Sequence, residues 1–396
     1  MRRPAVAAAV AAAVLLLAAC GTSPSPKAGS VPSSTPSTSS PSTPTEPATG
    51  TPSAKPAVLT PLRPGERRVS VKMPAAYTPS APTGVGTDDY RCFLLDPKIV
   101  TKSFVTGFDI RPGNPDVVHH VILFRVPPDQ VAAAEKKDAE TPGQGWTCFG
   151  TSGLGNDGSI DSAPWLGAWA PGGSERVYGK GLGEELDPGS RIIMQVHYNL
   201  LRGSKPDTSA AELRLTEDPR TTALDTQLLP APVELPCRPG HGGDLCDRSK
   251  ALADVKARFG DGPGSLADNL HLLCGGAAPG PVQSCTREIA SPETIRGVAG
   301  HMHLLGQKIT IEVNPGTPRA RTILDIPVWD FDNQGSRPTD PIHLVRGDTV
   351  KVTCTHSQDL RDRLPAFATQ RQDRYVLWGE GTTDEMCLGI LLVTRP

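Results

Sequence analysis

The chain has 396 residues, with 40 Lys and Arg against 42 Asp and Glu and a formal net charge of −2. This balance offers no clustered positive charge to neutralise nucleic-acid phosphates, and the length is too great for one hydrophobic core and fits two domains. The 40 Gly and 41 Pro favour short strands and turns and argue against an all-α protein.

Residues 1–19 are predicted to be a lipoprotein signal peptide. Two arginines precede an apolar run, Ala5 to Leu17, that is too short for a comfortable bilayer span. Leu17-Ala18-Ala19-Cys20 resembles a bacterial lipobox, which implies cleavage before Cys20 and lipidation of its thiol. The alternative is an ordinary signal peptide with a chance cysteine. We therefore expect an extracytoplasmic protein that is held at the bacterial cell membrane by lipid alone.

Residues 20–65 are expected to form a disordered stalk. Ser, Thr and Pro occupy 27 of the 40 positions from Gly21 to Thr60, which leaves almost nothing to bury. No later apolar run approaches the roughly 20 residues of a transmembrane helix. The remainder of the chain is therefore expected to fold outside the membrane.

From residue 66 onward the chain is typical of β structure. Runs of β-branched and apolar residues are bounded by Gly, Pro, Asn or Asp, and several alternate apolar and polar residues as half-buried strands do. These runs are Ile99–Ile110, Val117–Val126, Arg191–Leu200, Leu213–Leu215, Thr294–Gly300, Lys308–Val313, His343–Thr355 and Tyr375–Val393. They predict an all-β fold of two tandem sandwiches, over 66–204 and 205–396.

One segment, 237–285, departs from the β pattern and is predicted to be a small helical insertion in the second domain. Helical stretches are expected over Asp247–Phe259 and Ser265–Leu273, separated by a Gly- and Pro-containing break.

The cysteines indicate disulfides. Setting Cys20 aside leaves an even number, eight, in an oxidising compartment, so four bridges are expected. A thiolate metal site is the alternative, but no Cys-x2-Cys spacing supports it. Within the insertion we expect nested bridges, Cys246–Cys274 inside Cys237–Cys285.

Histidines carry the chemical signal, because five of only nine fall in three strand contexts. His119 and His120 lie in an otherwise apolar strand, His197 lies in a second strand, and His301 and His303 are spaced as His-x-His. Imidazoles are rarely placed in buried strands unless a partner such as a metal ion compensates their desolvation. Adjacent histidines face opposite ways on a regular strand, so His119 and His120 can share a metal only where the strand bends or ends.

The choice of metal depends on ligand softness. Imidazoles alone suit zinc, copper, nickel or iron. Met386 precedes Cys387 after an acidic turn and is ordinarily interpreted as a core methionine. A thioether joined with two imidazoles would instead favour Cu(I) over zinc.

These residues carry a family resemblance. The segments resemble, in order, the four copper-site motifs of the copper type II, ascorbate-dependent monooxygenases, the relatives of peptidylglycine α-hydroxylating monooxygenase and dopamine β-monooxygenase. They are Val118-His119-His120-Val121-Ile122-Leu123-Phe124, Gln195-Val196-His197-Tyr198, His301-Met302-His303-Leu304-Leu305-Gly306 and Asp384-Glu385-Met386-Cys387. The resemblance spans roughly Val69 to Pro396, and the 237–285 insertion does not fit it.

The resemblance implies two jelly-roll-like domains with one copper ion each. The first copper would be held by His119, His120 and His197, and the second, catalytic one by His301, His303 and Met386. It also implies the disulfides Cys92–Cys148 and Cys354–Cys387. Tyr90 and Gln195 match family positions near the first copper.

The activity implied is hydroxylation of a substrate C–H bond with O2 and a one-electron reductant such as ascorbate. Peptide-hydroxylating members clamp a substrate carboxylate with residues that correspond here to Ala299, Leu388 and Ile390. A C-terminal glycine peptide is therefore not the expected substrate, and a more apolar or differently anchored small molecule is. Trp329 and Trp378 are candidates for lining its pocket. The alternative is a non-enzymatic copper-binding or copper-delivery lipoprotein, and the oligomeric state is left open.

Overall fold

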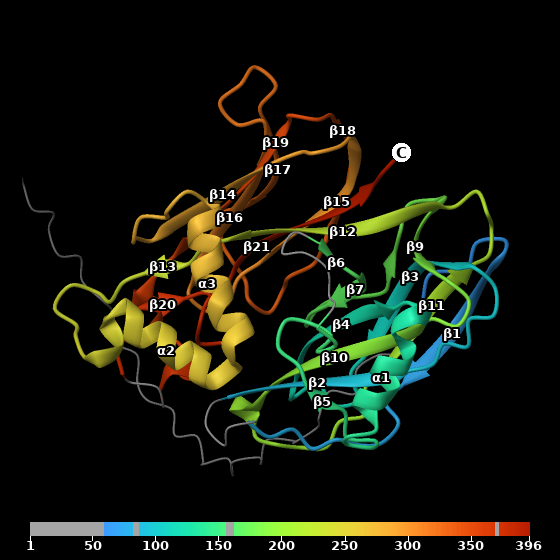
Figure 1. Ribbon diagram of the computed structural model, residues 1–396, viewed down its shortest axis with the longest axis horizontal. Coiled ribbons are helices and arrows are strands. Elements are labelled where there is room, and N and C mark those ends of the chain that lie inside the picture. The colour runs from blue at the N-terminus through green and yellow to red at the C-terminus, as the bar shows by residue number, and fades with distance from the viewer. Residues whose placement is uncertain (1–58, 82–86, 156–161, 369–371) are drawn as a thin grey trace, which may run out of the picture. The chain divides into compact units, whose positions relative to one another are not determined.

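The computed structural model describes residues 59–81, 87–155, 162–368 and 372–396 (Figure 1). The predicted signal peptide, the lipidation site Cys20 and most of the predicted stalk lie outside the described residues. The described residues belong to one compact unit, Ala57–Pro396. Among them, no helix combines the length and the apolar character needed to cross a membrane.

The strands are numbered in chain order. They are β1 (Glu66–Lys72), β2 (Asp88–Leu95), β3 (Ser103–Arg111), β4 (Val118–Val126), β5 (Trp146–Thr147), β6 (Ser162–Ala163), β7 (Trp165–Trp169), β8 (Arg176–Val177), β9 (Leu182–Leu186), β10 (Arg191–Asn199), β11 (Ala210–Thr216), β12 (Thr222–Ala231), β13 (Glu234–Leu235), β14 (Val282–Glu288), β15 (Glu293–His301), β16 (Gly306–Val313), β17 (Arg321–Ile326), β18 (Arg337–Leu344), β19 (Thr349–His356), β20 (Val376–Leu377) and β21 (Cys387–Thr394). The α-helices are α1 (Val131–Asp138), α2 (Arg248–Phe259) and α3 (Asp261–Leu273). The expected all-β fold with a small helical insertion is confirmed.

The N-terminal sandwich packs two sheets face to face. One has the order β5-β2-β10-β4-β7, and the other contains β1, β11, β3 and β9. Alternate side chains from both sheets meet in a single buried core, which includes Phe93 of β2, Val105 of β3, Leu123 of β4 and Leu213 of β11. This alternation is the reason that the sequence pattern of the strands repeats every two residues.

The C-terminal sandwich is built in the same way. The sheet order β14-β19-β16-β17 covers β12, β21, β15 and β18. Its core joins Ile295 of β15, Ile311 of β16, Val352 of β19 and Leu391 of β21, all at most 1% exposed.

The two sandwiches share one continuous ten-stranded sheet. β9 of the first pairs in parallel with β12 of the second, so the order runs β1-β11-β3-β9-β12-β21-β15-β18. β11 follows the boundary expected at 204/205, yet it pairs with β1 and β3. The chain therefore passes from the first sandwich to the second only after Thr216. The blue-to-green and orange-to-red halves of the ribbon show this division, with β12 crossing between them (Figure 1).

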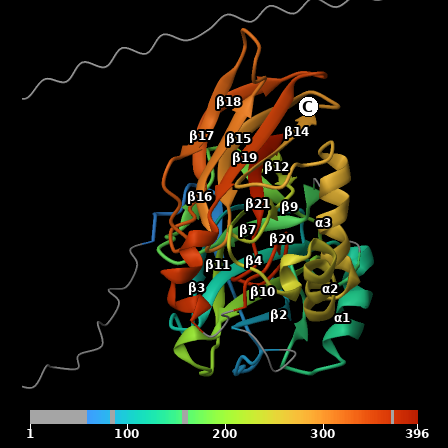
Figure 2. The same cartoon turned by 90° about the vertical axis from the view of Figure 1, so that its left-hand side faces the viewer.

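The insertion forms the expected helical pair. Asp247 caps α2 by accepting a hydrogen bond from the Lys250 backbone, and Gly260, with φ of +88°, ends it. α3 begins at Asp261, earlier than expected, because Pro and Gly are tolerated in the first turn of a helix. In the turned view both helices lie along one side of the strands (Figure 2).

The disulfides confirm two expected pairings and correct two. Cys92–Cys148 and Cys354–Cys387 are present as implied. The nested pairs Cys246–Cys274 and Cys237–Cys285 are wrong, since the bridges are Cys237–Cys246 and Cys274–Cys285. Each closes a short loop, one directly before α2 and the other directly after α3, so neither bridge spans the helical pair. Cysteine spacing in the sequence does not distinguish these local loops from nested ones.

Candidate metal centres

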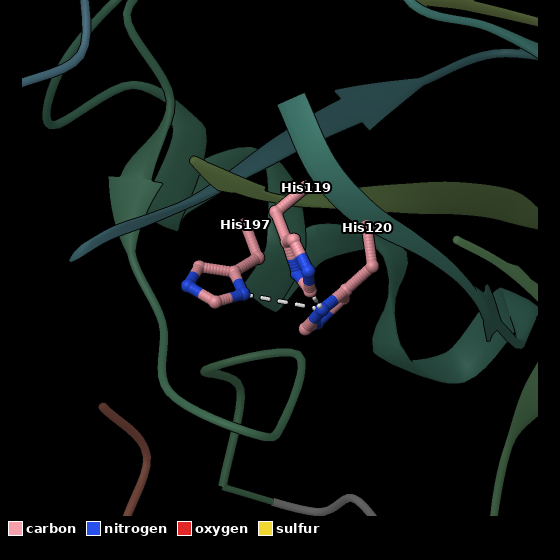
Figure 3. A group of neighbouring side chains, drawn as sticks. All are labelled: His119, His120 and His197. Carbon is pink, nitrogen blue, oxygen red and sulfur yellow. Dashed lines mark hydrogen bonds between the residues drawn. The ribbon is translucent and has the colours of Figure 1, made fainter. Parts of the chain in front are cut away.

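A β-bulge brings the two adjacent histidines of β4 to one site. Along β10, His197 pairs with His120, but the next residue, Tyr198, pairs with Val118, so His119 is left without an opposite residue. An extra residue of this kind turns its side chain out of the regular alternation. His119 and His120 therefore point the same way, toward His197 on the neighbouring strand (Figure 3).

The three imidazoles are spaced as ligands of one metal ion. His120 Nδ1 lies 3.1 Å from His197 Nδ1 and 3.4 Å from His119 Nδ1, and one nitrogen from each ring falls within 4.8 Å of the others. Two nitrogens bound to one metal at about 2.0–2.1 Å are separated by roughly 3.3–3.6 Å. The three imidazoles are therefore close enough together to be ligands of one metal ion such as zinc or copper.

Asp88 fixes the orientation of the His197 ring. Its Oδ1 lies 2.8 Å from His197 Nε2, and it also accepts a hydrogen bond from the Thr382 hydroxyl, which belongs to the other sandwich. Burial would raise the pKa of Asp88, but the hydrogen bonds from His197 and Thr382 outweigh it and hold the pKa below its usual value. An ionised carboxylate only accepts hydrogen bonds, so Nε2 of His197 carries the proton and Nδ1 presents its lone pair to the site.

His119 and His120 are neutral at physiological pH. Burial, reinforced by the neighbouring imidazole of His197, lowers the pKa of both rings well below the ordinary value. Metal binding needs the neutral imidazole, so no proton has to be displaced first.

The second set of predicted ligands lies at the end of β15. His301 is its last residue, and His303 follows in the turn, with ring centroids 5.1 Å apart. β21 pairs His301 with Leu388, which lies two residues after Met386. His301, His303 and Met386 line one cavity.

Glu385 holds these segments together. Its carboxylate is fully buried and accepts backbone hydrogen bonds from His303 at 3.0 Å, Leu305 at 2.5 Å and Met386 at 3.1 Å. The ring of His356 lies 3.3 Å from the same carboxylate. One side chain therefore fixes both the turn that carries His303 and the loop that carries Met386.

A loop between β17 and β18 contacts both sets of histidines. The Gln334 amide oxygen accepts from His301 Nδ1 at 2.6 Å, which leaves the lone pair of His301 Nε2 free to bind a metal. The Phe331 ring stacks on His119 with centroids 4.2 Å apart and lies edge-on to His303 at 6.4 Å. The His120 and His301 rings are themselves only 6.1 Å apart, so the two sets are neighbours.

The cavity has a volume of about 580 Å³ and is mainly apolar. Its wall includes His120 of the first set and all three predicted ligands of the second, with Ile122, Phe124, Trp165, Leu228, Leu388 and Ile390 among the apolar lining. Trp378 lines it as expected, whereas Trp329 is not among the lining residues. α3 of the insertion contributes Leu266 and Asn269, so the segment outside the family pattern forms part of the wall.

The two residues predicted near the first site differ in their contacts. The Tyr90 ring stacks on His197 with centroids 4.0 Å apart, and its hydroxyl donates to the Glu380 carbonyl at 2.7 Å. Gln195 lines the cavity, but its amide donates to the Thr151 carbonyl at 2.7 Å rather than to a histidine.

Sequence reasoning missed Asp88, Glu385 and Gln334, which position the ligands. Asp88 lies two residues before Tyr90, and Glu385 lies directly before Met386. Only the contacts that these two carboxylates make across the fold distinguish them from ordinary acidic residues on a protein surface. Gln334 lies in a loop with no pattern of its own, so no sequence signal marked it.

No family model and no curated protein matches the chain. Among solved structures, an allantoicase aligns over 74% of this chain and 78% of its own, with 13% identity and a TM-score of 0.17. Allantoicase from Saccharomyces cerevisiae aligns over 78% of each chain, with 12% identity and a TM-score of 0.18. The coconut allergen cocosin aligns over 83% of this chain and 85% of its own, with 10% identity and a TM-score of 0.15. Similarities this weak support no inference about the site.

Proposed function

We propose that the protein is a copper-dependent monooxygenase that hydroxylates a C–H bond of a small, largely apolar molecule with O2 and a one-electron reductant such as ascorbate. The observation that carries the proposal is that all three predicted ligands of the second set, and His120 of the first, line one apolar cavity. His119, His120 and His197 would hold one ion, and His301, His303 and Met386 the other. Bound copper would supply one-electron transfer and activation of dioxygen.

Softness of the donors supports copper rather than zinc. Three imidazoles accept either metal, but the thioether of Met386 beside two imidazoles suits Cu(I). Met386 is 7% exposed and lines the cavity, so its sulfur is available to a ligand as well as packed in the core.

The protein's own residues bind, orient and exclude water. Asp88 and Gln334 fix the protonated nitrogens of His197 and His301, so the opposite nitrogens face the sites. Glu385 holds the His303 turn against the Met386 loop. The apolar wall of the cavity desolvates a bound substrate and limits access of bulk water to the reacting C–H bond.

Burial of the ligands argues against the alternative of a copper-delivery protein. His119, His197 and His303 are at most 6% exposed, and the half-buried His120 and His301 line the cavity. Transfer to a partner protein requires an ion near the surface, whereas a small substrate can enter a cavity. The four disulfides are consistent with the proposed extracytoplasmic location.

Metal stoichiometry, combined with turnover, tests the proposed function. We expect two coppers per chain, falling to about one in Met386→Ala and in His197→Ala, and ascorbate-dependent O2 consumption matched by hydroxylated product in the wild type only. His343→Ala is a matched control, because that exposed ring bonds only Thr294. Zinc binding with no preference for copper would contradict the proposal. Two coppers with O2 uptake but no product on a broad substrate panel would favour the copper-binding alternative.

A further inference from the structure

Two side chains besides histidine on the cavity wall can carry charge, Arg176 and Glu380. Arg176 donates from Nη1 to the Ser336 carbonyl at 2.5 Å, while its Nε is buried without a hydrogen-bond partner. Within the described part of the chain no carboxylate forms an ion pair with it. A guanidinium has five N–H donors, so most of its hydrogen-bonding capacity is left for something in the cavity.

Arg176 reaches the cavity from the first sandwich and lies against the second. It begins β8, which pairs with β3 at Gly107, where an added Cβ would lie 2.4 Å from the Arg176 carbonyl oxygen. A Cβ on Gly297 of β15 would lie 3.6 Å from its Nη2. The guanidinium is therefore held over the strand that continues through Ala299 to His301 on the same cavity wall.

Charge on the wall is not balanced at neutral pH. Glu380 is 4% exposed, and burial, reinforced by Asp384, raises its pKa to about 8, so its carboxyl is mostly protonated at pH 7. Arginine keeps its charge in proteins. One half-buried cation without an ion-pair partner thus remains on a mainly apolar wall, and a partly desolvated charge of this kind is costly unless a ligand compensates it.

We propose that Arg176 anchors the carboxylate of an apolar substrate. The planar guanidinium matches a carboxylate through two parallel N–H···O bonds, and the apolar wall accepts the hydrocarbon part. α3 bounds this hydrocarbon site through Leu266. The proposal rests on the proposed function only in calling the ligand a substrate, since binding itself requires no metal.

Binding of a hydrophobic acid to the metal-free protein tests the anchor. Decanoate is the probe, with decanol and decylamine as matched ligands, measured by calorimetry on the full folded chain. We expect decanoate to bind at least about tenfold more tightly than decanol, because a charged hydrogen-bonding pair is added. Arg176→Gln should remove this advantage, and Arg176→Lys should keep part of it.

The control is Arg125→Gln, because Arg125 is also half-buried and donates to one backbone carbonyl, that of Glu185, but does not line the cavity. It should leave decanoate affinity unchanged. Decylamine binding as tightly as decanoate, with loss only in Glu380→Gln, would overturn the proposal in favour of an acidic anchor. If Arg176→Gln fails to fold, Arg176→Lys is compared with the wild type instead. Decanoate binding that is no tighter than decanol binding in both proteins would overturn the proposal as well.

The two proposals fail separately. Absence of copper binding together with Arg176-dependent decanoate binding would contradict the monooxygenase and support the anchor. Two bound coppers with no preference for decanoate would contradict the anchor and leave the monooxygenase standing.

Discussion

At the scale of single residues, the candidate site depends on two carboxylates that position the proposed metal ligands without being ligands themselves. Asp88 links His197 of one sandwich to Thr382 of the other, and Glu385 links the His303 turn to the Met386 loop. Carboxylates that orient metal-binding histidines typically contribute 10–100-fold to metal affinity.

Asp88→Asn tests this orientation. Asparagine keeps the size of the side chain but can donate as well as accept, so His197 is no longer held with Nδ1 free. We expect copper affinity of the first site to fall about 10–100-fold while the far-UV circular dichroism is unchanged. Thr382→Val removes the second contact of Asp88 and should have a smaller effect, and exposed Asp116→Asn should have none. Unchanged affinity in Asp88→Asn would show that the carboxylate does not position the ring.

Arg214 provides a pH-dependent contribution to stability. It is fully buried in β11, with Glu66 at 2.5 Å and Glu175 at 3.3 Å. Burial would raise the pKa of Glu66, but the hydrogen bonds from Arg63, Thr106 and Arg214 outweigh it and lower the pKa. Because the pKa of Glu66 is lower in the folded than in the unfolded state, its ionised carboxylate stabilises the fold at pH values above the unfolded-state pKa of about 4.3. This stabilisation is lost as the pH falls through the folded-state pKa.

Arg214→Leu should therefore destabilise the fold most at neutral pH. Two carboxylates lose their buried partner, which costs about 3–5 kcal/mol of unfolding free energy at pH 7. Urea unfolding at pH 7 and at about pH 3.5 should show a smaller difference from wild type at the lower pH, because the unfolded-state carboxyls are largely protonated there and the stabilisation from the lowered folded-state pKa is being lost. Arg220→Leu, whose side chain is 88% exposed, is the control. A difference independent of pH would rule out the ionic explanation.

At the scale of elements, the helical insertion is fastened to the loop that carries Met386. Arg258 of α2 donates through Nη1 and Nη2 to the two carboxylate oxygens of Asp384, at 2.6 and 2.7 Å, and Asp384 is buried. The Phe259 ring packs edge-on against Phe149 of the first sandwich with centroids 5.1 Å apart. The insertion thus supports both the cavity wall and the second ligand set.

Arg258→Met should loosen this attachment without unfolding the sandwiches. The apolar stem is kept, but the Asp384 carboxylate then retains only the ion pair with Arg374 at 3.6 Å and the hydrogen bond from the Gly381 backbone N–H at 3.2 Å. We expect faster amide hydrogen exchange across α3 and residues 381–386, and weaker copper binding at the second site than at the first. Lys250→Met on the same helix removes an exposed ion pair with Asp244 and should change neither. If amide hydrogen exchange in these segments is as slow in Arg258→Met as in Lys250→Met, the proposed attachment through Arg258 and Asp384 would be contradicted.

At the scale of the whole molecule, the shared sheet makes the two sandwiches one folding unit. β9 and β12 pair in parallel, and Tyr90 donates across the halves to the Glu380 carbonyl. The stacking of Phe331 on His119 adds a third contact. Cores joined through a continuous sheet are expected to unfold together rather than in two steps.

A cut in the turn after Asp218 tests this unity. A protease site inserted there severs the covalent link before β12, yet the two fragments should elute as one particle and unfold in one transition followed by both circular dichroism and tryptophan fluorescence. An equal insertion in the exposed turn at Gly316 is the control. Separation of the fragments under native conditions would show that the sandwiches are independent domains.

Much of the fold was determined by local patterns in the sequence. Runs of β-branched and apolar residues, some of them alternating with polar ones, predicted β4, β10, β15 and β16 close to their observed bounds, because such runs are a property of the local sequence. The Gly- and Pro-containing break located the end of α2 for the same reason. Strands as short as β5, β8 and β13 carry no such pattern, since two residues cannot show a period.

What the sequence by itself determined is the kind of chain: strand-rich, disulfide-bonded and carrying five histidines and one methionine in suggestive positions. Only the tertiary structure decided how they meet. The bulge at His119 follows from the register of β4 against β10, and the cysteine pairing 237–246 and 274–285 follows from the packing of two helices. Asp88, Glu385 and Arg176 gain their roles from partners far away in the chain. Alternation is encoded residue by residue, whereas register and long-range contact are fixed by the packing of the entire core.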